Sequence, residues 1–507
     1  MRIINTAELT ATTLPTYDEQ LFVYNGLDVC VTLEIFEEIQ KQLDPISQRT
    51  YNFSLALQAP ILEMNMRGSL VDLEYSGKLI FEFKELQDKV KRNFDRITIE
   101  GLGVSINPQS PVALNKLFYE VLELPPVKKR RPDGTFGVTT NREALEKLKI
   151  YSIAEPLINH ILLYRDLGKK ISFLKTEIDP DSRIRTSFNI AGTVTGRLSS
   201  SHSDFGSGTN LQNIEKKLRR VIVADPGMKF ANIDLEQSDA RNVGALLINM
   251  FHNDPSRSTN CSAYLDACES GDLHTAVCRM AWPELPWTGD AKSDREVADY
   301  LAYRDLSFRD MAKKLGHGTN YYGQPPTMAK HTKVDRAPIE LFQKKYFAAF
   351  PHIRYWHDET RRQLLTTGTL ITPFGRRRRF FGRLDDDSTL REAIAYIPQS
   401  MTADEIDEGI LRLWRLNKVQ LLIQVHDSIL FQYPEELEPT VIPIAMQALQ
   451  IEQTLVNGRK FTVPAEVKTG WNWADFDETN PDGLMKYRGK DVRSRSAPVA
   501  FLDRLVY

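Results

Sequence analysis

The chain has 507 residues, which is enough for roughly three domains of about 150 residues each. Its residues are 42% hydrophobic and 26% charged, an ordinary balance for a globular protein that argues against a mainly disordered chain. Lys and Arg number 65 and Asp and Glu number 67, so the formal net charge is -2. This balance argues against a uniformly basic nucleic-acid wrapper, but it is compatible with a local basic groove.

No membrane or secretion signal is evident in the sequence. No apolar run approaches the length of a membrane span, and residues 1–20 lack a basic region followed by a hydrophobic stretch. The four cysteines form no C-x-x-C pair. Three of them lie near His274, but their spacing favours reduced structural thiols over a metal site. We therefore expect a cytoplasmic protein, in the host cytoplasm if the chain is viral, with no membrane partner.

The N-terminal third is predicted to be mostly helical. Apolar periodicity predicts helices over 21–40, from 51 toward Gly68, 110–118, 139–148 and 157–174. Thr140 and Glu143 have the spacing of a capping box at the start of the fourth helix. The basic run Lys128–Arg131 lies in a predicted loop over 125–137, where a solvated loop is favoured over a phosphate contact.

Short strands are predicted after Asp181. A hairpin is expected from strands over 221–223 and 229–234, joined by the turn Asp225-Pro-Gly227. A long helical region follows, from about 236 to 366, and strands return at 421–431. This order of strand, helices and strand predicts an α/β (α+β) protein with one sheet and a helical insertion.

Two aspartates stand at the ends of predicted strands. Asp234 closes an apolar strand, and Asp427 lies at the tip of a predicted hairpin that contains no Gly or Asn. Each alone is compatible with an ordinary helix cap or turn residue. On neighbouring strands, however, the pair would suit two Mg²⁺ ions about 3.5–4 Å apart. Water and substrate phosphates would complete the coordination of each ion.

Side chains that suit a nucleotide recur at every fourth position of one predicted helix: Arg309, Lys313, His317 and Tyr321. On a helix they form one face about 18 Å long, with cations for phosphates and rings for sugar and base. A solvated charged face is the alternative. Gly316 and Gly318 each cost about 1 kcal/mol within a helix, which indicates a close approach there. Pro325-Pro326 are expected to end the element.

These residues belong to a longer ordered series of short motifs between about Tyr51 and Trp473. The series comprises Met66-Arg-Gly68 with Val71-Asp72, Ile106-Asn-Pro108, Thr195 to Ser200 with Asn210 to Ile214, Asp234 to Arg241, Asp272-Leu-His-Thr275, Arg309 to Gly323, Gly375-Arg-Arg377, Pro398-Gln399, Gln424-Val-His-Asp427 and Gly470-Trp-Asn-Trp473. In this order they resemble the family A DNA polymerases (the DNA polymerase I family), particularly bacteriophage-type members.

The resemblance implies a right-hand polymerase fold, with an antiparallel palm sheet, helical fingers and a helical thumb. The resemblance also implies how the chain is divided. Residues 1–45 would be a remnant of the end of a 3′–5′ exonuclease-like domain. Residues 46–185 would form the palm entry and thumb, 186–250 the first part of the palm, 251–389 the fingers and 390–507 the second part of the palm. Tyr24-x-x-x-Asp28 resembles the last exonuclease motif, and a packing helix is the alternative. A complete proofreading site is not expected on this chain.

The resemblance also implies site residues. Asp234, Asp427 and the Leu235 carbonyl would bind two Mg²⁺ ions, with Mn²⁺ as an alternative. Arg309, Lys313, His274 and Gln237 would hold the phosphates of a dNTP, Lys313 also neutralising charge in catalysis, while Tyr321, His317 and Asp239 would lie at its base and sugar. Contacts to primer, template or minor groove would come from Arg197, Asn210, Gln212, Arg391, Gln399 and His426.

Some residues depart from the family pattern. Asp239 replaces a Glu that is thought to exclude a ribose 2′-hydroxyl, which puts sugar discrimination in doubt. His317 replaces Phe or Tyr, so the packing of sugar and base is in doubt as well. Further departures are Ser428 for an auxiliary Glu, Ala395 for an Asn, and an enlarged loop over 201–209. The basic run Arg376–Arg379 has two open interpretations, contact with DNA or pairing with the acids at 385–387.

The sequence therefore predicts a template-directed, DNA-dependent DNA polymerase that uses two-metal phosphoryl transfer, in phage or phage-like replication. Its expected partners are primed template DNA and dNTPs, and a separately encoded exonuclease, helicase or processivity factor would be a further partner. The alternative is a catalytically inactive DNA-binding replication accessory on the same fold. A metal-dependent nuclease is a third class, but it would have no use for the cationic helix face.

Overall fold

The computed structural model describes residues 17–131 and 133–489, which form two compact units. The sheet unit contains Ala59–Ser238, Glu405–Thr454 and the described residues from Lys460 to Gly489. The helical unit contains the described residues from Tyr17 to Gln58, Asp239–Asp404 and Leu455–Arg459. Each unit is therefore assembled from segments that lie far apart in the sequence.

The sheet unit is built on one five-stranded antiparallel sheet with the order β12-β13-β7-β16-β17. Its strands are β7 (Met228–Leu235), β12 (Gln420–Val425), β13 (Ser428–Pro434), β16 (Ala465–Gly470) and β17 (Met485–Lys486). Helix α17 (Glu438–Leu449) packs against β7, β13 and β16. Rings on the central strands, such as Phe230 and Phe431, are fully buried. The predicted single sheet interrupted by a helical insertion is confirmed.

The local hairpin predicted around Asp225-Pro-Gly227 is wrong. The turn exists, with the Met228 N–H donating to the Asp225 carbonyl at 2.9 Å. Ile222 and Val223, however, form single bridges with Val71 and Asn472 instead of pairing with β7. Both edges of β7 are already paired, with β13 and β16, so tertiary pairing displaced the local alternative.

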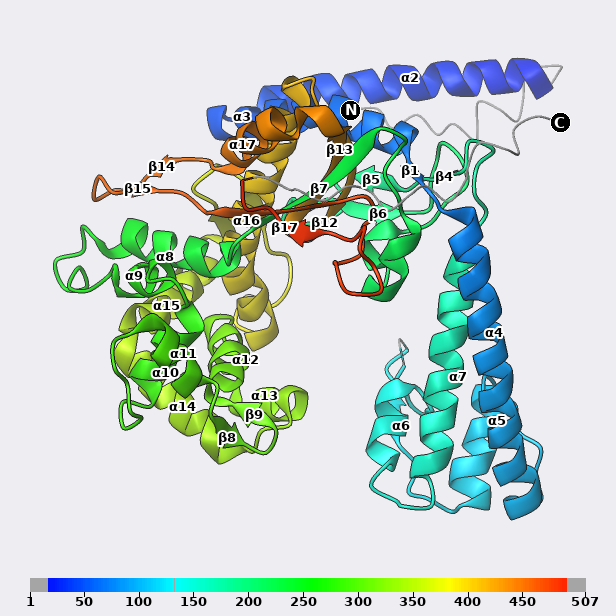
Figure 1. Ribbon diagram of the computed structural model, residues 1–507. Helices are drawn as coiled ribbons and strands as arrows, with labels where there is room; N and C mark the ends of the chain where they lie inside the picture. Colours follow the sequence, from blue (N-terminus) through cyan, green and yellow to red (C-terminus); the bar gives the residue numbers. More distant parts are fainter. Residues whose placement is uncertain (1–16, 132, 490–507) are drawn as a thin grey trace. The chain divides into compact units, whose positions relative to one another are not determined.

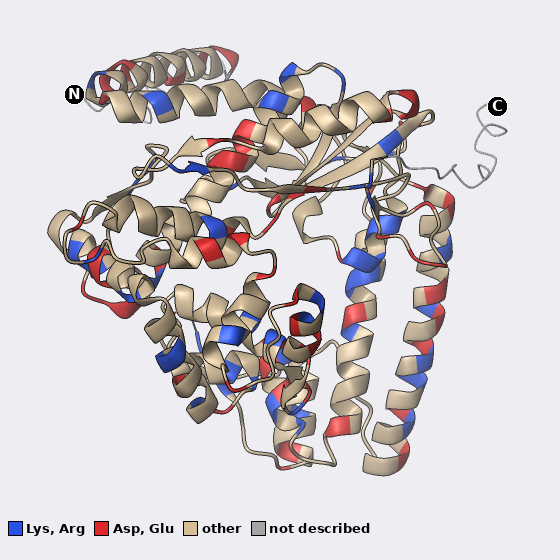
Figure 2. Cartoon of the chain, turned by 60° about the vertical axis from the view of Figure 1, so that its left-hand side comes forward, with Lys and Arg blue, Asp and Glu red and all other residues tan. Residues whose placement is uncertain are grey.

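A pair of long helices, α4 (Leu73–Asp95) and α7 (Glu155–Leu174), packs side by side in the sheet unit (Figure 1). Near one end of the pair, α5 (Pro111–Asn115) and α6 (Arg142–Leu148) enclose a small core that includes Phe94, Phe118 and Ile158. Basic and acidic residues are interspersed along the pair (Figure 2). The predicted helices at 110–118 and 157–174 are confirmed, the first continuing past α5 as η2 (Lys116–Val121).

Two local predictions in this region need correction. The loop predicted over 125–137 contains a short hairpin of β2 (Lys128–Arg130) and β3 (Phe136–Val138). The cap of α6 is Asn141, whose side chain accepts from the Ala144 N–H at 2.9 Å, and not Thr140. Asn141 has the extended backbone of an N-cap, and Asn is at least as good a cap as Thr.

Shorter elements complete the sheet unit: β1 (Ser69–Leu70), η1 (Arg96–Gly101), β4 (Arg183–Ile184), β5 (Ser187–Asn189), β6 (Ser199–Ser201), η3 (Leu211–Asn213), η4 (Lys216–Val221), η5 (Glu435–Leu437), β14 (Gln453–Thr454) and β15 (Lys460–Phe461). Among the described elements, α3 (Pro45–Arg67) and α16 (Asp387–Arg415) cross the boundaries between the units, and α8 (Ser238–Phe251) has only its first residue, Ser238, in the sheet unit.

The helical unit is formed by the remaining elements. They are α2 (Tyr17–Gln42), α8 (Ser238–Phe251), α9 (Ala263–Glu269), α10 (Leu273–Ala281), α11 (Ala291–Ala298), β8 (Leu301–Tyr303), β9 (Leu306–Ser307), α12 (Phe308–Asn320), α13 (Pro325–Thr332), α14 (Arg336–Ala349), α15 (Pro351–Thr367), β10 (Thr369–Ile371) and β11 (Arg377–Arg379). The predicted helix at 21–40 is confirmed as α2. No helix among the described residues is both long and apolar enough to cross a membrane.

Helix α12 differs from its prediction at the C-terminal end. It ends at Asn320, before the two prolines, and Pro325-Pro326 instead begin α13. Proline suits the first turn of a helix because the N–H that it lacks would have no helical partner there. Internal packing accounts for Gly318, since a Cβ there would lie 2.8 Å from the Met328 methyl carbon.

The basic run on β11 is paired with acids other than those predicted. Arg376 binds Asp404 at 2.5 Å, and Arg377 binds Asp44 at 2.6 Å. Arg378 binds Glu392 at 2.6 Å. Of the two open interpretations, pairing with the acids at 385–387 is therefore not found for these three arginines, and contact with DNA stays a prediction. For the cysteines, the structure agrees with the expectation of reduced structural thiols. None of the four is in a disulfide, and Cys261, Cys268 and Cys278 are buried.

A buried ion pair stabilises the sheet unit. Lys229 on β7 binds Glu438 at the start of α17 at 2.7 Å, with side-chain exposures of 3% and 9%. The Tyr433 hydroxyl donates to the same carboxylate at 3.1 Å, and the ammonium lies 4.6 Å from the centre of the Trp471 ring. Strand β7 and helix α17 are thus joined by an ion pair that is largely shielded from solvent.

We predict that Lys229→Met lowers the free energy of unfolding by about 3 kcal/mol, because it leaves the Glu438 carboxylate buried without its cation. Lys229→Met combined with Glu438→Leu should recover much of the loss, since both charges are then gone. Lys460→Met, which breaks an exposed pair with Glu452, is the control and should cost less than about 1 kcal/mol. Denaturant unfolding measures all three, and equal losses for Lys229→Met and the control would contradict the prediction.

Candidate active site

The sheet register brings the two predicted acids together. Ser428, the first residue of β13, lies opposite Asp234 on β7, and the Leu235 N–H donates to the Asp427 carbonyl at 3.1 Å. Residues 426–427 form the tight turn between β12 and β13, and His426 there has a φ of 53°. Asp234 and Asp427 therefore occupy adjacent positions at one end of the sheet.

The residues that surround Asp427 also come from the sheet unit. The Ser238 hydroxyl donates to one carboxylate oxygen of Asp427 at 3.1 Å. The Arg197 guanidinium lies 3.5 Å from the other oxygen. The Asp427 side chain is 29% exposed, so it is held by protein on several sides while remaining open to solvent. Ser238 was not identified from the sequence, because nothing local links it to a turn so distant in the chain.

Negative charge is concentrated at this end of the sheet. The surrounding protein reduces the hydration of the Asp234 carboxylate, although part of it reaches solvent, and this desolvation is the largest cause of its raised pKa. The nearby charges of Asp427 and of Glu466, which lies opposite Asp234 on β16, add to it, and together these effects raise the pKa of Asp234 to about 6. A cation bound here would relieve this repulsion.

The donor set is one that a hard divalent cation accepts. It consists of two carboxylates and the backbone carbonyl of Leu235, all oxygen donors. Among the described residues, no group of three or more His, Cys, Asp or Glu side chains is placed to hold a metal. Mg²⁺ commonly takes only one or two protein carboxylates and completes its shell with water and phosphate oxygens. The residues present therefore fit Mg²⁺ better than a metal that needs a full cage of side chains.

Four of the predicted DNA-contacting residues lie in the sheet unit and two in the helical unit. The Gln212 amide donates to the Gln424 side chain at 2.9 Å, and Gln424 in turn donates to the His426 carbonyl. The Asn210 amide donates to the Ser200 carbonyl at 2.6 Å. The Gln212 and Gln424 amides thus lie beside the turn that carries Asp427. The remaining members of the set are Arg197, beside Asp427, and Arg391 and Gln399, on α16 in the helical unit.

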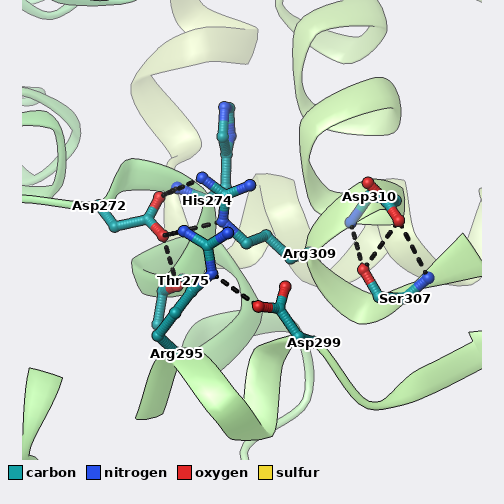
Figure 3. A network of polar contacts seen from close by, with 8 residues as sticks. All are labelled: Asp272, His274, Thr275, Arg295, Asp299, Ser307, Arg309 and Asp310. Atoms are coloured by element: carbon teal, nitrogen blue, oxygen red, sulfur yellow. Dashed lines mark hydrogen bonds and ion pairs between the residues drawn. The ribbon is translucent and has the colours of Figure 1, made fainter. Parts of the chain in front are cut away.

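Helix α12 presents the predicted cationic face. Arg309, Lys313 and His317 lie on the helix, and Lys313 and His317 are exposed. Tyr321 follows directly as the C-cap, with its ring 4.9 Å from the His317 ring in an edge-to-face arrangement. Ser307 and Asp310 form a capping box at the start of α12 (Figure 3). The spacing predicted this face correctly, apart from the end of the helix before Tyr321.

A cavity of about 60 Å³ lies beside this face, within the helical unit. Four residues predicted to bind nucleotide line it: Asp239, His274, His317 and Tyr321. Apolar and aromatic side chains such as Leu273, Val277 and Tyr346 form much of the rest of its wall. Gln237, another predicted nucleotide contact, lies in the sheet unit just before α8 and has a φ of 54°.

The centre of the polar network beside the cavity is Asp272, which the sequence placed in a family motif without assigning it a role. Its carboxylate accepts from Arg309 at 2.9 and 3.2 Å, from Arg295 at 3.1 Å and from the Thr275 hydroxyl at 2.7 Å (Figure 3). Asp272 is also the N-cap of α10 and accepts from the His274 N–H. Its position before a predicted helix is a cap signal, but nothing local indicates the two arginines.

Burial and neighbouring charges within this network shift the pKa values of Asp272 and His274. Burial alone would raise the pKa of Asp272, but hydrogen bonds from Arg309 and Thr275 and the charges of Arg309 and Arg295 hold it well below its usual range. Burial, together with the charge of Arg309, lowers the pKa of His274 to about 4. At neutral pH His274 is therefore uncharged and offers a hydrogen bond, while Arg309 and Lys313 supply the positive charge.

We predict that Asp272→Asn destabilises the protein at pH 7 and that this difference disappears in acid. A carboxyl whose pKa is depressed in the folded state stabilises that state above the unfolded pKa, about 3.9. The stabilisation is lost as the pH falls below that value toward the folded pKa. The free energies of unfolding of the two proteins, measured between pH 7 and pH 2, should therefore differ by a constant amount above about pH 5 and by progressively less below about pH 4. A difference that stays constant over this range would contradict the assignment of Asp272 as an ionised partner of the arginines.

Comparisons with known proteins agree with this geometry. Residues 78–475 match the family model described as DNA polymerase family A. The chain is 27% identical over 436 residues to "DNA polymerase I, thermostable" of Thermus filiformis, which covers 82% of this chain and 46% of that protein. It is 27% identical over 489 residues to DNA polymerase I of Chloroflexus aurantiacus, which covers 91% and 47%. The chain thus spans about half the length of these relatives.

A solved structure supports the fold. The polymerase domain of Pol1 from M. smegmatis, in complex with DNA primer-template and dNTP, aligns with a TM-score of 0.63 and 23% identity, over 83% of this chain and 69% of that one. The fold is therefore the right-hand polymerase fold that the motifs predicted. Because the family model spans most of the sequence and includes both strand-end aspartates, the chain belongs to DNA polymerase family A.

Proposed function

We propose that this protein is a template-directed, DNA-dependent DNA polymerase that adds dNMPs to a primer 3′-hydroxyl. The observation that supports this most strongly is the pairing of Asp234 and Asp427 on adjacent strands of an antiparallel sheet. An inactive accessory protein would not need to keep two mutually repelling carboxylates in this arrangement. The relatives named DNA polymerase I support the same activity.

Asp234, Asp427 and the Leu235 carbonyl would hold two Mg²⁺ ions, with Mn²⁺ as an alternative. When bound there, the ions supply Lewis-acid chemistry that favours ionisation of the primer 3′-hydroxyl and stabilises charge on the pyrophosphate. Arg197 and Ser238, which contact Asp427, would keep its carboxylate oriented. Preorganised donors of this kind need no rearrangement when the reaction occurs.

The face of α12 would bind the triphosphate of the incoming dNTP. Arg309 would offer a planar fork of donors, and Lys313, one turn along, a point charge that neutralises the transferring phosphoryl group. Asp272 already fixes the Arg309 guanidinium with two hydrogen bonds, which reduces the loss of side-chain freedom on binding. Neutral His274 and Gln237 would add hydrogen bonds to phosphate oxygens. Tyr321, His317 and Asp239 would contact the base and sugar.

Primed template DNA would contact the side chains around the Asp427 turn and those on α16. Amides at Asn210, Gln212 and Gln399 suit minor-groove acceptors that all correct base pairs share. Arg197, Arg391 and His426 would contact primer or template strands. In this map the sheet is the palm, the α4–α7 pair is the thumb and the helices from α9 to α15 are the fingers. A role in phage or phage-like replication, with a separate exonuclease, helicase or processivity factor, completes the proposal.

We predict that Asp427→Asn lowers the rate of primer extension by about 10³-fold, because a cation site of this kind contributes several kcal/mol and each 1.36 kcal/mol is a factor of ten. The change keeps the shape of the side chain, so affinity for primed duplex should change little. Glu452→Gln, an exposed carboxylate on the same unit, is the control and should extend primers normally. Extension by Asp427→Asn at the normal rate would refute the assignment of this site.

We predict that Arg309→Ala raises the KM for dNTP by about 10- to 100-fold, because a hydrogen bond to a charged group contributes about 1.5–3 kcal/mol. Lys314→Ala is the matched control, since Lys314 is an exposed cation on α12 that does not belong to the four-residue repeat. Steady-state single-nucleotide extension measures both variants. Equal effects of the two substitutions would indicate a general electrostatic attraction rather than a phosphate contact at Arg309.

A further inference from the structure

A buried relay of hydrogen bonds holds one wall of the cavity beside α12. The Thr402 hydroxyl, on α16, donates to one carboxylate oxygen of Asp239 at 2.9 Å. The Asn242 amide donates to the same hydroxyl at 3.2 Å. Thr402 is 1% exposed and Asn242 is fully buried. All three residues belong to the helical unit, as does the cavity that Asp239 lines.

The donor and acceptor groups of these three side chains determine which group donates each hydrogen bond. An amide NH₂ group can only donate, so Asn242 occupies a lone pair of the Thr402 oxygen. The single hydroxyl proton is then directed to Asp239, where a bond to an ionised acceptor is stronger than a neutral one. Asn242 and Asp239 lie one turn apart on α8, so α8 and α16 are joined at this point.

The bond from Thr402 helps to fix the position of the Asp239 carboxylate. The Asp239 side chain is only half-buried, and rotation about its χ1 and χ2 would move the carboxylate oxygens. Fixing χ1 and χ2 of Asp239 costs conformational entropy. A hydrogen bond from Thr402, whose hydroxyl is buried and fixed in place, can offset that cost. The cavity is small, about 60 Å³, so a shift of one carboxylate changes the space that a bound group can occupy.

We propose that Thr402 is a positioning residue that holds the Asp239 carboxylate at the cavity wall and thereby determines how strongly ribonucleotides are excluded. The proposal rests on the proposed function, in which the sugar of the incoming nucleotide lies beside Asp239. The bond from Thr402 opposes movement of the carboxylate away from a 2′-hydroxyl. Without this donor, less free energy is needed to rotate the carboxylate aside, or to turn one of its oxygens toward the 2′-hydroxyl so that it accepts a hydrogen bond. Either change favours rNTP over dNTP.

The test is single-nucleotide extension of a primed template with a dNTP and, separately, with the matching rNTP. We expect Thr402→Val to raise the ratio of kcat/KM for rNTP to that for dNTP by about tenfold, the scale of one charge-assisted hydrogen bond. Thr402→Ser, which keeps the hydroxyl, should leave the ratio within about twofold of the unsubstituted enzyme. Thr402→Ala, which adds no methyl group beside the carboxylate, should reproduce the shift if Thr402→Val folds poorly.

A double-mutant cycle separates positioning from a general structural effect. If Thr402 acts through Asp239, then adding Thr402→Val to Asp239→Ala should not change the ratio further. The proposal is overturned if both Thr402→Val and Thr402→Ala leave the ratio unchanged, if Thr402→Ser shifts it as much, or if Thr402→Val keeps its full effect in the Asp239→Ala background. The absence of any dNTP extension by the unsubstituted protein is a different result, and it would refute the proposed function itself.

Discussion

The hydrogen bond from the Leu235 N–H to the Asp427 carbonyl joins the two halves of the candidate catalytic centre. It belongs to the ladder between β7 and β13, which lie far apart in the sequence and flank the helical insertion. A shift of one residue in this ladder would turn one aspartate toward the opposite face of the sheet. The register is secured by buried residues on both strands, such as Ile233, Ile429 and Phe431. The position of the acids therefore depends on the core packing of the neighbouring residues on the same strands.

The same register has an electrostatic cost. It sets Asp234 beside Asp427 and opposite Glu466, and the pKa of Asp234 rises to about 6 because its ionised form is poorly hydrated and repelled. Repulsion of this kind destabilises a fold unless a cation offsets it. Elsewhere in the sheet unit a buried carboxylate, that of Glu438, has its own ammonium partner in Lys229. The contrast supports the view that the acids at the strand ends serve a bound cation.

In the helical unit, charge is organised around Asp272. One carboxylate binds Arg309 and Arg295, so two cations lie close together without full mutual repulsion. The same environment keeps His274 neutral. At the wall of the cavity, the Thr402 hydroxyl donates to the carboxylate of Asp239. Arg309, His274 and Asp239 are thus each supported by a neighbour whose role was not evident from the sequence, and such support positions a site accurately.

Local patterns in the sequence were enough to predict several features. The four-residue repeat from Arg309 predicted the α12 face, because side chains four apart share one side of a helix. The apolar stretches around Asp427 predicted the β12–β13 hairpin, because buried strands are continuous apolar runs. The ordered motifs predicted the family and its fold, which the family comparison confirms. The roles of the individual site residues stay predictions.

Other features were decided only by tertiary structure. Strand pairing across the insertion displaced the local hairpin at Asp225, since β7 had stronger partners on both edges. The acids that pair with Arg376 and Arg377 are brought close by folding, and no local pattern identifies them. Thr402 likewise meets Asp239 only because α8 and α16 pack together. The sequence by itself determined the periodicity and chemistry of each segment. Which segments meet depends on burial and hydrogen bonding summed over the whole chain, so the neighbours that position the site appear only in the folded protein.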